Sequence, residues 1–285
     1  MRLEFTKMQG AGNDYIYIDC MTRDIRLTAA DIVWLSDRHF GVGGDGVILI
    51  RPSAVADGRM EMYNKDGSGA MCGNGLRCVA AYLYNHGYAK KEQIAVETVG
   101  GIRMLDMIVE DGVAVGAAAD MGAAMQNNAD IPVLYEGSNI DIPVQAAGRQ
   151  WQATCVSMGN PHAVVFVEDV KNLDLAAVGP AFERHPLFPR GVNAEFIRVI
   201  SDSELEMRVW ERGTGETLAC GTGACAAAVA AVLKGYCRQD TPITVHLPGG
   251  DLIITYLSDG RVILSGEARE VFQGQITSNK ETKGV

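Results

Sequence analysis

The sequence predicts an α+β protein with two pseudo-symmetric lobes, each a mostly antiparallel, curled β-sheet around a long central helix, with an active site in the interlobe cleft. Three observations support this prediction: the chain repeats itself after about half its length, most apolar runs are strand-like, and each half contains one long apolar helix. With 285 residues, 47% of them hydrophobic, the chain can form about two domains with packed cores.

The internal repeat is anchored by the motif Cys-Gly-x-Gly, which begins at Cys72 and again 148 positions later at Cys220. Other short motifs recur in the same order at offsets of 147 to 150 positions: Gly12 with Gly159, Gly41 with Gly191, Gly100 with Gly249, and Asp111 with Asp259. The repeat predicts an N-terminal lobe at 1–118, completed by a C-terminal strand at about 267–275, and a C-terminal lobe at 119–266. A linker is expected between Ala117 and Gly148, and a frayed tail at 276–285.

Runs rich in β-branched residues, several of them alternating, predict matching strands in both halves. In the first half they lie at 4–9, 15–19, 46–50, 59–63, 94–99 and 102–110; in the second at 153–158, 163–167, 195–200, 205–210, 242–247 and 252–257. One shorter helix is expected in each half, near 28–38 and 173–182.

The long helices are predicted directly after the two cysteines, because each Gly-x-Gly turn opens into a run rich in Ala, Val and Leu. In the first, Leu76, Val79 and Leu83 follow helical spacing, whereas 224–233 is apolar on all faces. Both helices are therefore expected to be buried.

Composition excludes several classes of function. The net charge is −10 and no basic cluster occurs, so nucleic acid is a poor partner. No apolar run reaches the ~18 residues of a membrane span, and the N-terminus lacks a signal core, so a cytoplasmic protein is expected. The seven cysteines are an odd number spread along the chain, which argues against a disulfide scaffold. They form no Cys-x-x-Cys pair that would suggest a zinc site or a redox dithiol.

A cysteine at a helix N-terminus lies near the positive end of the helix dipole, so its pKa is expected to fall below the usual ~8.5. The same amides can hold a carboxylate, and the flanking glycines let the backbone approach a ligand. If the repeat brings both helix starts to one cleft, one thiolate can remove an α-proton while the opposing thiol delivers a proton to the other face. That pair of steps inverts a stereocentre, and no pyridoxal lysine site or metal cluster is evident as another electron sink.

These motifs resemble the diaminopimelate epimerase family, cofactor-independent two-cysteine epimerases of lysine and peptidoglycan precursor biosynthesis. The similarity runs through "KMQGAGNDYIYID", "RHFGVGGDGVILI", "MCGNGLRC", "SMGNPHAVVFV", "RGVNAEFIRV" and "ERGTGETLACGTGACA", nearly the whole chain. It implies no metal or cofactor, a small amino-acid substrate and a homodimer. By resemblance, Cys72 and Cys220 form the acid/base pair.

The resemblance also implies a substrate site. Helix-start amides at Gly73, Asn74, Gly221 and Thr222 would bind the carboxylate at the reacting carbon. A polar set would hold the rest of the substrate, mainly its distal amino-acid end: Asn13, Asn64, Asn160, Asn193, Glu211 and Arg212. His162 is a possible supporting residue near Cys72 or the substrate. The chain departs from the family at Gly46, where Gln is frequent, and in a shorter loop before Cys72.

Two alternatives remain at this stage. A racemase of another amino acid, such as histidine, could use the same two-cysteine scaffold, although histidine lacks a second zwitterionic end. A non-catalytic amino-acid-binding protein, or an isomerase of the related phenazine-biosynthesis type, would not need both cysteines.

Overall fold

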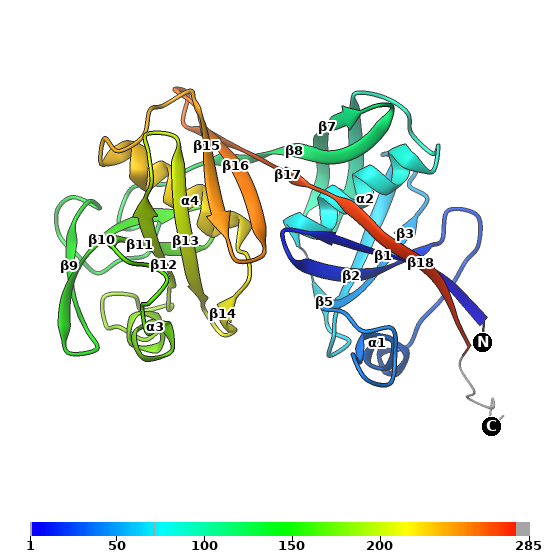
Figure 1. The fold of residues 1–285 in the computed structure, drawn as a ribbon, viewed down its shortest axis with the longest axis horizontal. Helices are drawn as coiled ribbons and strands as arrows, with labels where there is room; N and C mark the ends of the chain where they lie inside the picture. Colours follow the sequence, from blue (N-terminus) through cyan, green and yellow to red (C-terminus); the bar gives the residue numbers. More distant parts are fainter. Residues whose placement is uncertain (1, 71, 278–285) are drawn as a thin grey trace. The chain divides into compact units, whose positions relative to one another are not determined.

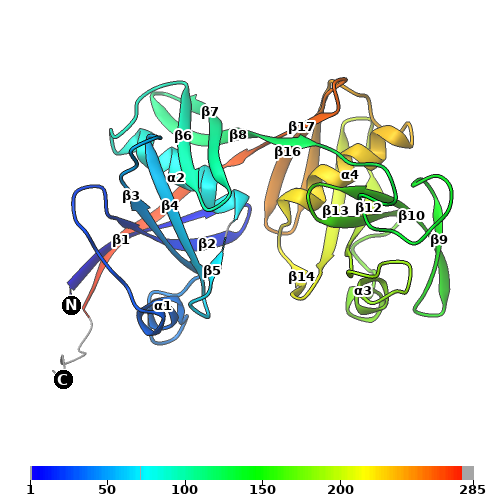
Figure 2. The same ribbon diagram turned by 180° about the vertical axis from the view of Figure 1, so that it is seen from behind.

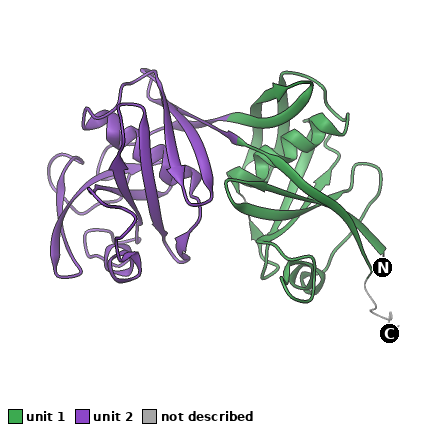
Figure 3. Ribbon diagram, in the orientation of Figure 1, with its two compact units in different colours: residues 1–118, 267–285 green, residues 119–266 purple. Residues whose placement is uncertain are grey.

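A computed structural model describes residues 2–70 and 72–277, and the chain divides into two compact units. Unit 1 comprises residues 1–118 and 267–285, and unit 2 comprises residues 119–266 (Figure 3). The predicted α+β class is confirmed, because each unit combines two helices with a curled, mainly antiparallel sheet (Figures 1 and 2).

Unit 1 contains most of the N-terminal strands and the last strand of the chain. Its helices are α1 (Ala29–Ser36) and α2 (Gly73–Asn85). Its strands are β1 (Arg2–Gly10), β2 (Asn13–Asp19), β3 (Gly46–Arg51), β4 (Gly58–Asn64), β5 (Gly69–Ala70), β6 (Gln93–Thr98), β7 (Gly101–Glu110) and β18 (Arg269–Thr277).

Unit 2 repeats this order of elements after one additional strand at its start. Its helices are α3 (Leu175–Glu183) and α4 (Gly221–Leu233). Its strands are β9 (Ile142–Ala146), β10 (Arg149–Ser157), β11 (Pro161–Phe166), β12 (Asn193–Val199), β13 (Glu204–Glu211), β14 (Gly215–Thr217), β15 (Pro242–Leu247), β16 (Gly250–Tyr256) and β17 (Arg261–Glu267).

The sheet topology repeats between the units in detail. In unit 1, β2 pairs in parallel with β3, and β4 pairs in parallel with β6. In unit 2, β11 pairs in parallel with β12, and β13 pairs in parallel with β15. Antiparallel ladders connect β3 to β4 and β12 to β13. The internal repeat in the sequence therefore corresponds to one supersecondary pattern used twice.

The long helices form the centre of each unit. α2 packs against β1, β2, β4, β6 and β7, and α4 packs against β10 to β13, β15 and β16. From Ala224 to Ala231 every residue of α4 is buried, as its all-apolar sequence predicts. None of the helices in the described part of the chain is long and apolar enough to cross a membrane.

The chain passes from unit 1 to unit 2 inside strand β8 (Val113–Ala123), between Ala118 and Ala119. The region expected to be a linker thus contains the end of β8 and also β9. Alanine and glycine have low strand propensity, so the sequence alone does not indicate β8. Pairing with neighbouring strands outweighs this low propensity. At the C-terminus β18 runs antiparallel to β1 up to Thr277; the rest of the expected tail, 278–285, lies outside the described residues.

Candidate active site

The first half-site lies at the start of α2, where Cys72 is the N-cap residue in an extended conformation (φ −137°, ψ 127°). The first bond inside the helix runs from the Leu76 N–H to the Cys72 carbonyl, so the amides of Gly73, Asn74 and Gly75 precede the helical ladder. Cys72 is only partly buried, and Gly73 is exposed. The arrangement suits an anionic group beside the thiol.

Asparagine side chains adjoin this helix start. Asn74 Nδ2 donates to Asn13 Oδ1 at 2.6 Å, and the fully buried Arg77 donates through Nη2 to Asn74 Oδ1 at 2.9 Å. Asn13 Nδ2 in turn lies 3.4 Å from Asp45 Oδ2. The structure thus brings together two of the predicted substrate-binding residues, Asn13 and Asn74.

A salt-bridge network anchors the loop behind Asn13. The buried Lys7 ammonium lies 2.7 Å from Asp14 Oδ2, and Arg38 bridges Asp14 and Asp45 at 2.6 and 3.0 Å. Burial raises the pKa of Asp14, but the hydrogen bonds and charges of Arg38 and Lys7 outweigh that effect and hold it below its usual range. The network fixes the start of β2, which carries Asn13.

Asn64, at the end of β4, is not hydrogen-bonded to the other predicted residues; its Nδ2 donates to Ser68 Oγ at 3.1 Å. Its register partner across the ladder is Gly46. A Cβ on Gly46 would lie 2.0 Å from the Tyr63 carbonyl oxygen. The departure from the family pattern at Gly46 therefore matches a backbone approach that leaves no room for a side chain.

The second half-site lies at the start of α4, where Cys220 is the N-cap residue (φ −132°, ψ 110°). The Gly223 N–H donates to Cys220 Sγ at 3.4 Å, and Thr222 Oγ1 lies 3.6 Å from the same sulfur. The amides of Gly221 and Thr222 precede the first helical bond, which runs from Ala224 N–H to the Cys220 carbonyl. Both long helices thus start at an extended N-cap cysteine, but only the Cys220 side chain accepts a cap hydrogen bond.

A hydrogen-bonded row leads from Thr222 into the interior of unit 2. Asn160 Nδ2 donates to Thr222 Oγ1 at 3.3 Å, and His162 Nε2 lies 3.0 Å from Asn160 Oδ1. His162 Nδ1 lies 2.7 Å from Glu195 Oε1, and both of these side chains are fully buried. His162 therefore supports Asn160 and Glu195 in unit 2.

Several residues predicted to bind the distal end of the substrate lie near one another in unit 2. Asn193 Oδ1 accepts from the Arg212 backbone N–H at 2.8 Å, which fixes the turn after β13. The Arg212 side chain is directed by a 2.7 Å bond from Nη1 to the Arg190 carbonyl. Glu211 Oε1 accepts from the Thr217 hydroxyl. The start of β12 and the end of β13 therefore bring Asn193, Glu211 and Arg212 next to one another.

The expectation of a lowered pKa is wrong for Cys220. Burial raises the pKa of this thiol well above its ordinary value, and the carboxylates of Glu211 and Glu195 add to the effect. The contacts from Thr222 and Gly223 lower it by less. In this environment burial and the neighbouring carboxylates outweigh the effect of the helix start. In unit 1, burial followed by the nearby Cys72 raises the pKa of Tyr15.

Sequence reasoning missed Glu195, Lys7, Arg77 and Tyr15. A signal existed for one of them, because Glu195 is a charged residue between Ala194 and Phe196 in the mostly apolar strand β12. Such residues are rarely fully buried without a functional or pairing reason. Nothing in the sequence indicates which partner each would meet.

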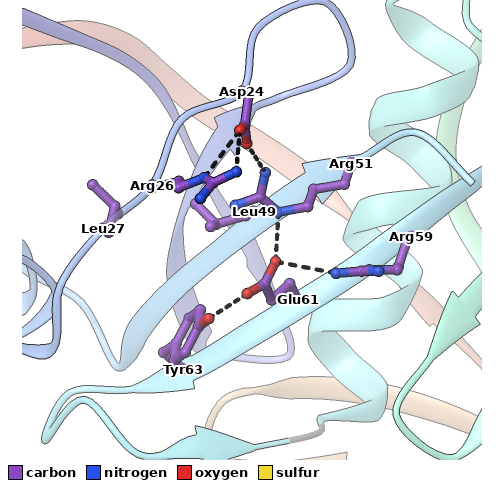
Figure 4. Close-up of a pocket in the computed structure, with 8 residues that line it drawn as sticks. All are labelled: Asp24, Arg26, Leu27, Leu49, Arg51, Arg59, Glu61 and Tyr63. Atoms are coloured by element: carbon purple, nitrogen blue, oxygen red, sulfur yellow. Dashed lines mark hydrogen bonds and ion pairs between the residues drawn. The ribbon is translucent and has the colours of Figure 1, made fainter.

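A separate pocket of about 420 Å³ lies on unit 1, and none of the predicted site residues lines it (Figure 4). Arg51 contacts Asp24 at 3.1 Å and Glu61 at 2.5 Å, and Arg59 lies 3.6 Å from Glu61. The Tyr63 hydroxyl donates to Glu61. These contacts hold β3 and β4 against the loop after β2. The charged residues that line the pocket therefore have a structural role.

Among residues 2–70 and 72–277 no group of three or more His, Cys, Asp or Glu side chains is arranged to hold a metal ion.

The fold and the two half-sites define a class: a two-unit α+β protein with a cysteine capping the central helix of each unit. Its fold matches solved structures of low sequence identity. A PhzF-family phenazine biosynthesis protein of Bacillus anthracis aligns with a TM-score of 0.68 at 17% identity, covering 98% of this chain and 100% of that one. A probable proline racemase of Agrobacterium radiobacter aligns with a TM-score of 0.65 at 15% identity, covering 99% and 94%.

Sequence comparison is more specific. The diaminopimelate epimerase family profile matches residues 5–126 and 154–271. Proteins named diaminopimelate epimerase from Agathobacter rectalis and Desulfovibrio desulfuricans are 48% and 49% identical, each over 96% of this chain and 99% and 98% of their own lengths. The chain belongs to the diaminopimelate epimerase family, and the resemblance seen in its motifs is confirmed.

Proposed function

We propose that this enzyme interconverts LL- and meso-diaminopimelate by proton transfer between two thiols and the substrate α-carbon. The family membership supports the substrate, and the observation that carries the mechanism is the repeated N-cap cysteine, Cys72 on α2 and Cys220 on α4. A racemase of another amino acid is not favoured, because relatives matched along nearly the whole chain are named diaminopimelate epimerase.

In the proposed reaction one thiolate forms an S–H bond as the substrate Cα–H bond breaks. The electron pair spreads into the adjacent carboxyl group, where first-turn amides of the helices stabilise the developing charge. The other thiol then loses its S–H proton to the opposite face of the same carbon. The product has inverted configuration, and the two sulfurs have exchanged protonation states.

The amide donors proposed for the reacting carboxylate are those of Gly73, Asn74, Gly221 and Thr222. Asn13, Asn64, Asn160, Asn193, Glu211 and Arg212 are proposed to recognise the remaining polar groups of the substrate. Glu211 supplies a carboxylate for the distal ammonium, and Arg212 supplies a planar donor for the distal carboxylate. His162 is proposed as a supporting residue that orients Asn160.

The test is α-hydrogen exchange in D₂O. The purified enzyme is incubated separately with LL-diaminopimelate, L-histidine and L-proline, and deuterium at the α-carbon is followed by NMR. We expect incorporation into diaminopimelate alone, with formation of the meso isomer. Exchange into histidine or proline but not diaminopimelate would contradict the proposed substrate.

We also propose a homodimer, on the basis of family membership. The expected sedimentation behaviour is that of two chains, and a species of 30.5 kDa at micromolar concentration would contradict it.

A further inference from the structure

The two units place chemically different side chains at one equivalent position. In the parallel ladders Tyr15 lies opposite Gly46, and His162 lies opposite Asn193. Two residues further along, β3 carries Ile48 and β12 carries Glu195.

Both side chains pack against the second glycine of their unit's Cys-Gly-x-Gly motif. A Cβ on Gly75 would lie 2.8 Å from Ile48 Cδ1, and a Cβ on Gly223 would lie 2.8 Å from Glu195 Oε1. Ile48 and Glu195 therefore occupy equivalent places in the two half-sites.

The fold does not require a carboxylate at this position. Ile48 and Glu195 are both fully buried, and Glu195 Oε2 has no hydrogen-bond partner among the described residues. Burying a carboxylate with one oxygen unsatisfied is unfavourable, whereas burying isoleucine is favourable. Because unit 1 builds the same packing with isoleucine, a role outside packing accounts best for Glu195.

Glu195 lies close to the thiol of its half-site. The point that a Gly223 Cβ would occupy is 2.8 Å from Glu195 Oε1 and 3.2 Å from Cys220 Sγ, so the oxygen and sulfur lie within about 6 Å of each other. A like charge at that distance disfavours the ionised form of its neighbour. A thiolate at Cys220 would thus lie near the Glu195 carboxylate, which can approach because residue 223 is glycine.

The other groups around Cys220 and Glu195 come from each neighbouring element. Glu211 of β13 adds negative charge, and Cys155 of β10 is a buried thiol. His162 of β11 holds Glu195 Oε1 at 2.7 Å. Burial raises the pKa of Glu195 above its usual range, and the charge of Glu211 adds to that shift. His162 opposes the shift without reversing it, so the histidine supports the charged form of the carboxylate.

Around Cys72 the neighbouring titratable groups differ. They are two tyrosines and a buried thiol, Tyr15, Tyr17 and Cys78, and the Arg77 guanidinium acts on Cys78. The carboxylates of Asp14 and Asp45, which act on Tyr15, are ion-paired with Lys7 and Arg38. No carboxylate stands where Glu195 stands in unit 2, because Ile48 fills that place.

We propose that Glu195 is a positioning residue that keeps the transferable proton on Cys220 in the resting enzyme. Cys72 is then the thiolate for the epimer whose α-proton faces it, and the opposite epimer reacts from the less populated state with the proton on Cys72. The inference rests on the proposed two-thiol function. In turnover of the epimer whose α-proton faces Cys72, the Cys72 sulfur gains the substrate proton, and the Cys220 sulfur loses its own to the opposite face. Glu195 then favours return of a solvent proton to Cys220 as Cys72 releases one, which restores the starting state.

The test measures ionisation of Cys220 without turnover. Thiolate absorbance in the ultraviolet is titrated in full-length Cys72→Ala protein, and the signal of Cys72→Ala/Cys220→Ala protein is subtracted, so that tyrosines and other cysteines cancel. Adding Glu195→Gln to both chains is expected to move the Cys220 midpoint to lower pH by about one unit. An unchanged midpoint, or a shift to higher pH, would overturn the inference.

Two further variants keep the test decisive. Glu204→Gln removes an exposed carboxylate from β13 of the same unit and is expected to leave the midpoint in place. Glu195→Ile introduces the residue that unit 1 uses and is expected to give the same downward shift if Glu195→Gln fails to fold. Exchange of α-deuterium by the parent enzyme reports on the proposed function separately, since the titration does not depend on it.

Discussion

The His162 ring and the Glu195 carboxylate form a fully buried pair, with Nδ1 2.7 Å from Oε1. Because Glu195 Oε2 has no partner among the described residues, His162 is the main support of that carboxylate. The pair links the core of unit 2 to Asn160 and so to the start of α4.

Removing His162 alone should destabilise the protein strongly. His162→Leu leaves the Glu195 carboxylate buried without its hydrogen-bond partner, and we expect a loss of roughly 3–5 kcal/mol in the free energy of unfolding. The measurement is urea unfolding at neutral pH. His162→Leu/Glu195→Ile removes both polar groups and should regain part of that loss; a double variant as unstable as the sum of the singles would show that the pair is not energetically coupled.

Neither cysteine should be replaceable for inversion. Cys72→Ala and Cys220→Ala each remove the proposed proton-transfer group from one face of the substrate carbon, so we expect no measurable conversion of LL- to meso-diaminopimelate by either. The measurement is chiral separation of the product. Cys237→Ala, which removes a buried thiol outside both half-sites, serves as the control and should retain activity. A single-cysteine variant that epimerises at the parental rate would refute the two-thiol mechanism.

Arg212→Ala should weaken substrate binding more than it slows chemistry. Its guanidinium is directed by the Arg190 carbonyl, and its proposed role is to grip the distal carboxylate. Loss of such a charge-assisted contact is expected to cost roughly 2–5 kcal/mol of binding, seen as a large rise in KM with a smaller change in kcat. Steady-state kinetics provide the measurement, and Arg190→Ala, which keeps the carbonyl, is the matched control. An unaltered KM would place Arg212 outside the substrate site.

Glu61 should make stability dependent on acid pH. Desolvation raises the pKa of this carboxyl, but hydrogen bonds from Tyr63 and Arg51 outweigh it and hold the pKa below its usual range. A lowered folded-state pKa contributes stability above the unfolded value of about 4.3, and that contribution disappears as pH falls through the folded value.

We therefore expect Glu61→Gln to cost up to about 1 kcal/mol at neutral pH, with the difference from the parent vanishing in acid. Urea unfolding across this pH range is the measurement, with Glu110→Gln, at the exposed end of β7, as the control. A difference that stays constant down to strongly acidic pH would show that the Glu61 charge does not stabilise the fold.

The sequence by itself determined the repeat, the α+β class and the long helices. Cys72 and Cys220 were identified from a local pattern, a cysteine on a Gly-x-Gly turn before an apolar run, and local patterns of this kind fix helix starts. The family followed from the same motifs because they extend over nearly the whole chain. Features that depend on residues close together in the chain can be predicted directly from the sequence.

Only the tertiary structure decided the environment of each thiol. The contact between Glu195 and His162 joins two strands separated by α3, and the approach of Glu195 to Gly223 joins β12 to α4. Burial and neighbouring charge depend on such long-range contacts, which outweigh the helix-start effect and raise the pKa of Cys220. For the same reason the sequence showed two equivalent cysteines, whereas the structure places Ile48 against Gly75 in one unit and Glu195 against Gly223 in the other, so the two thiols have different surroundings.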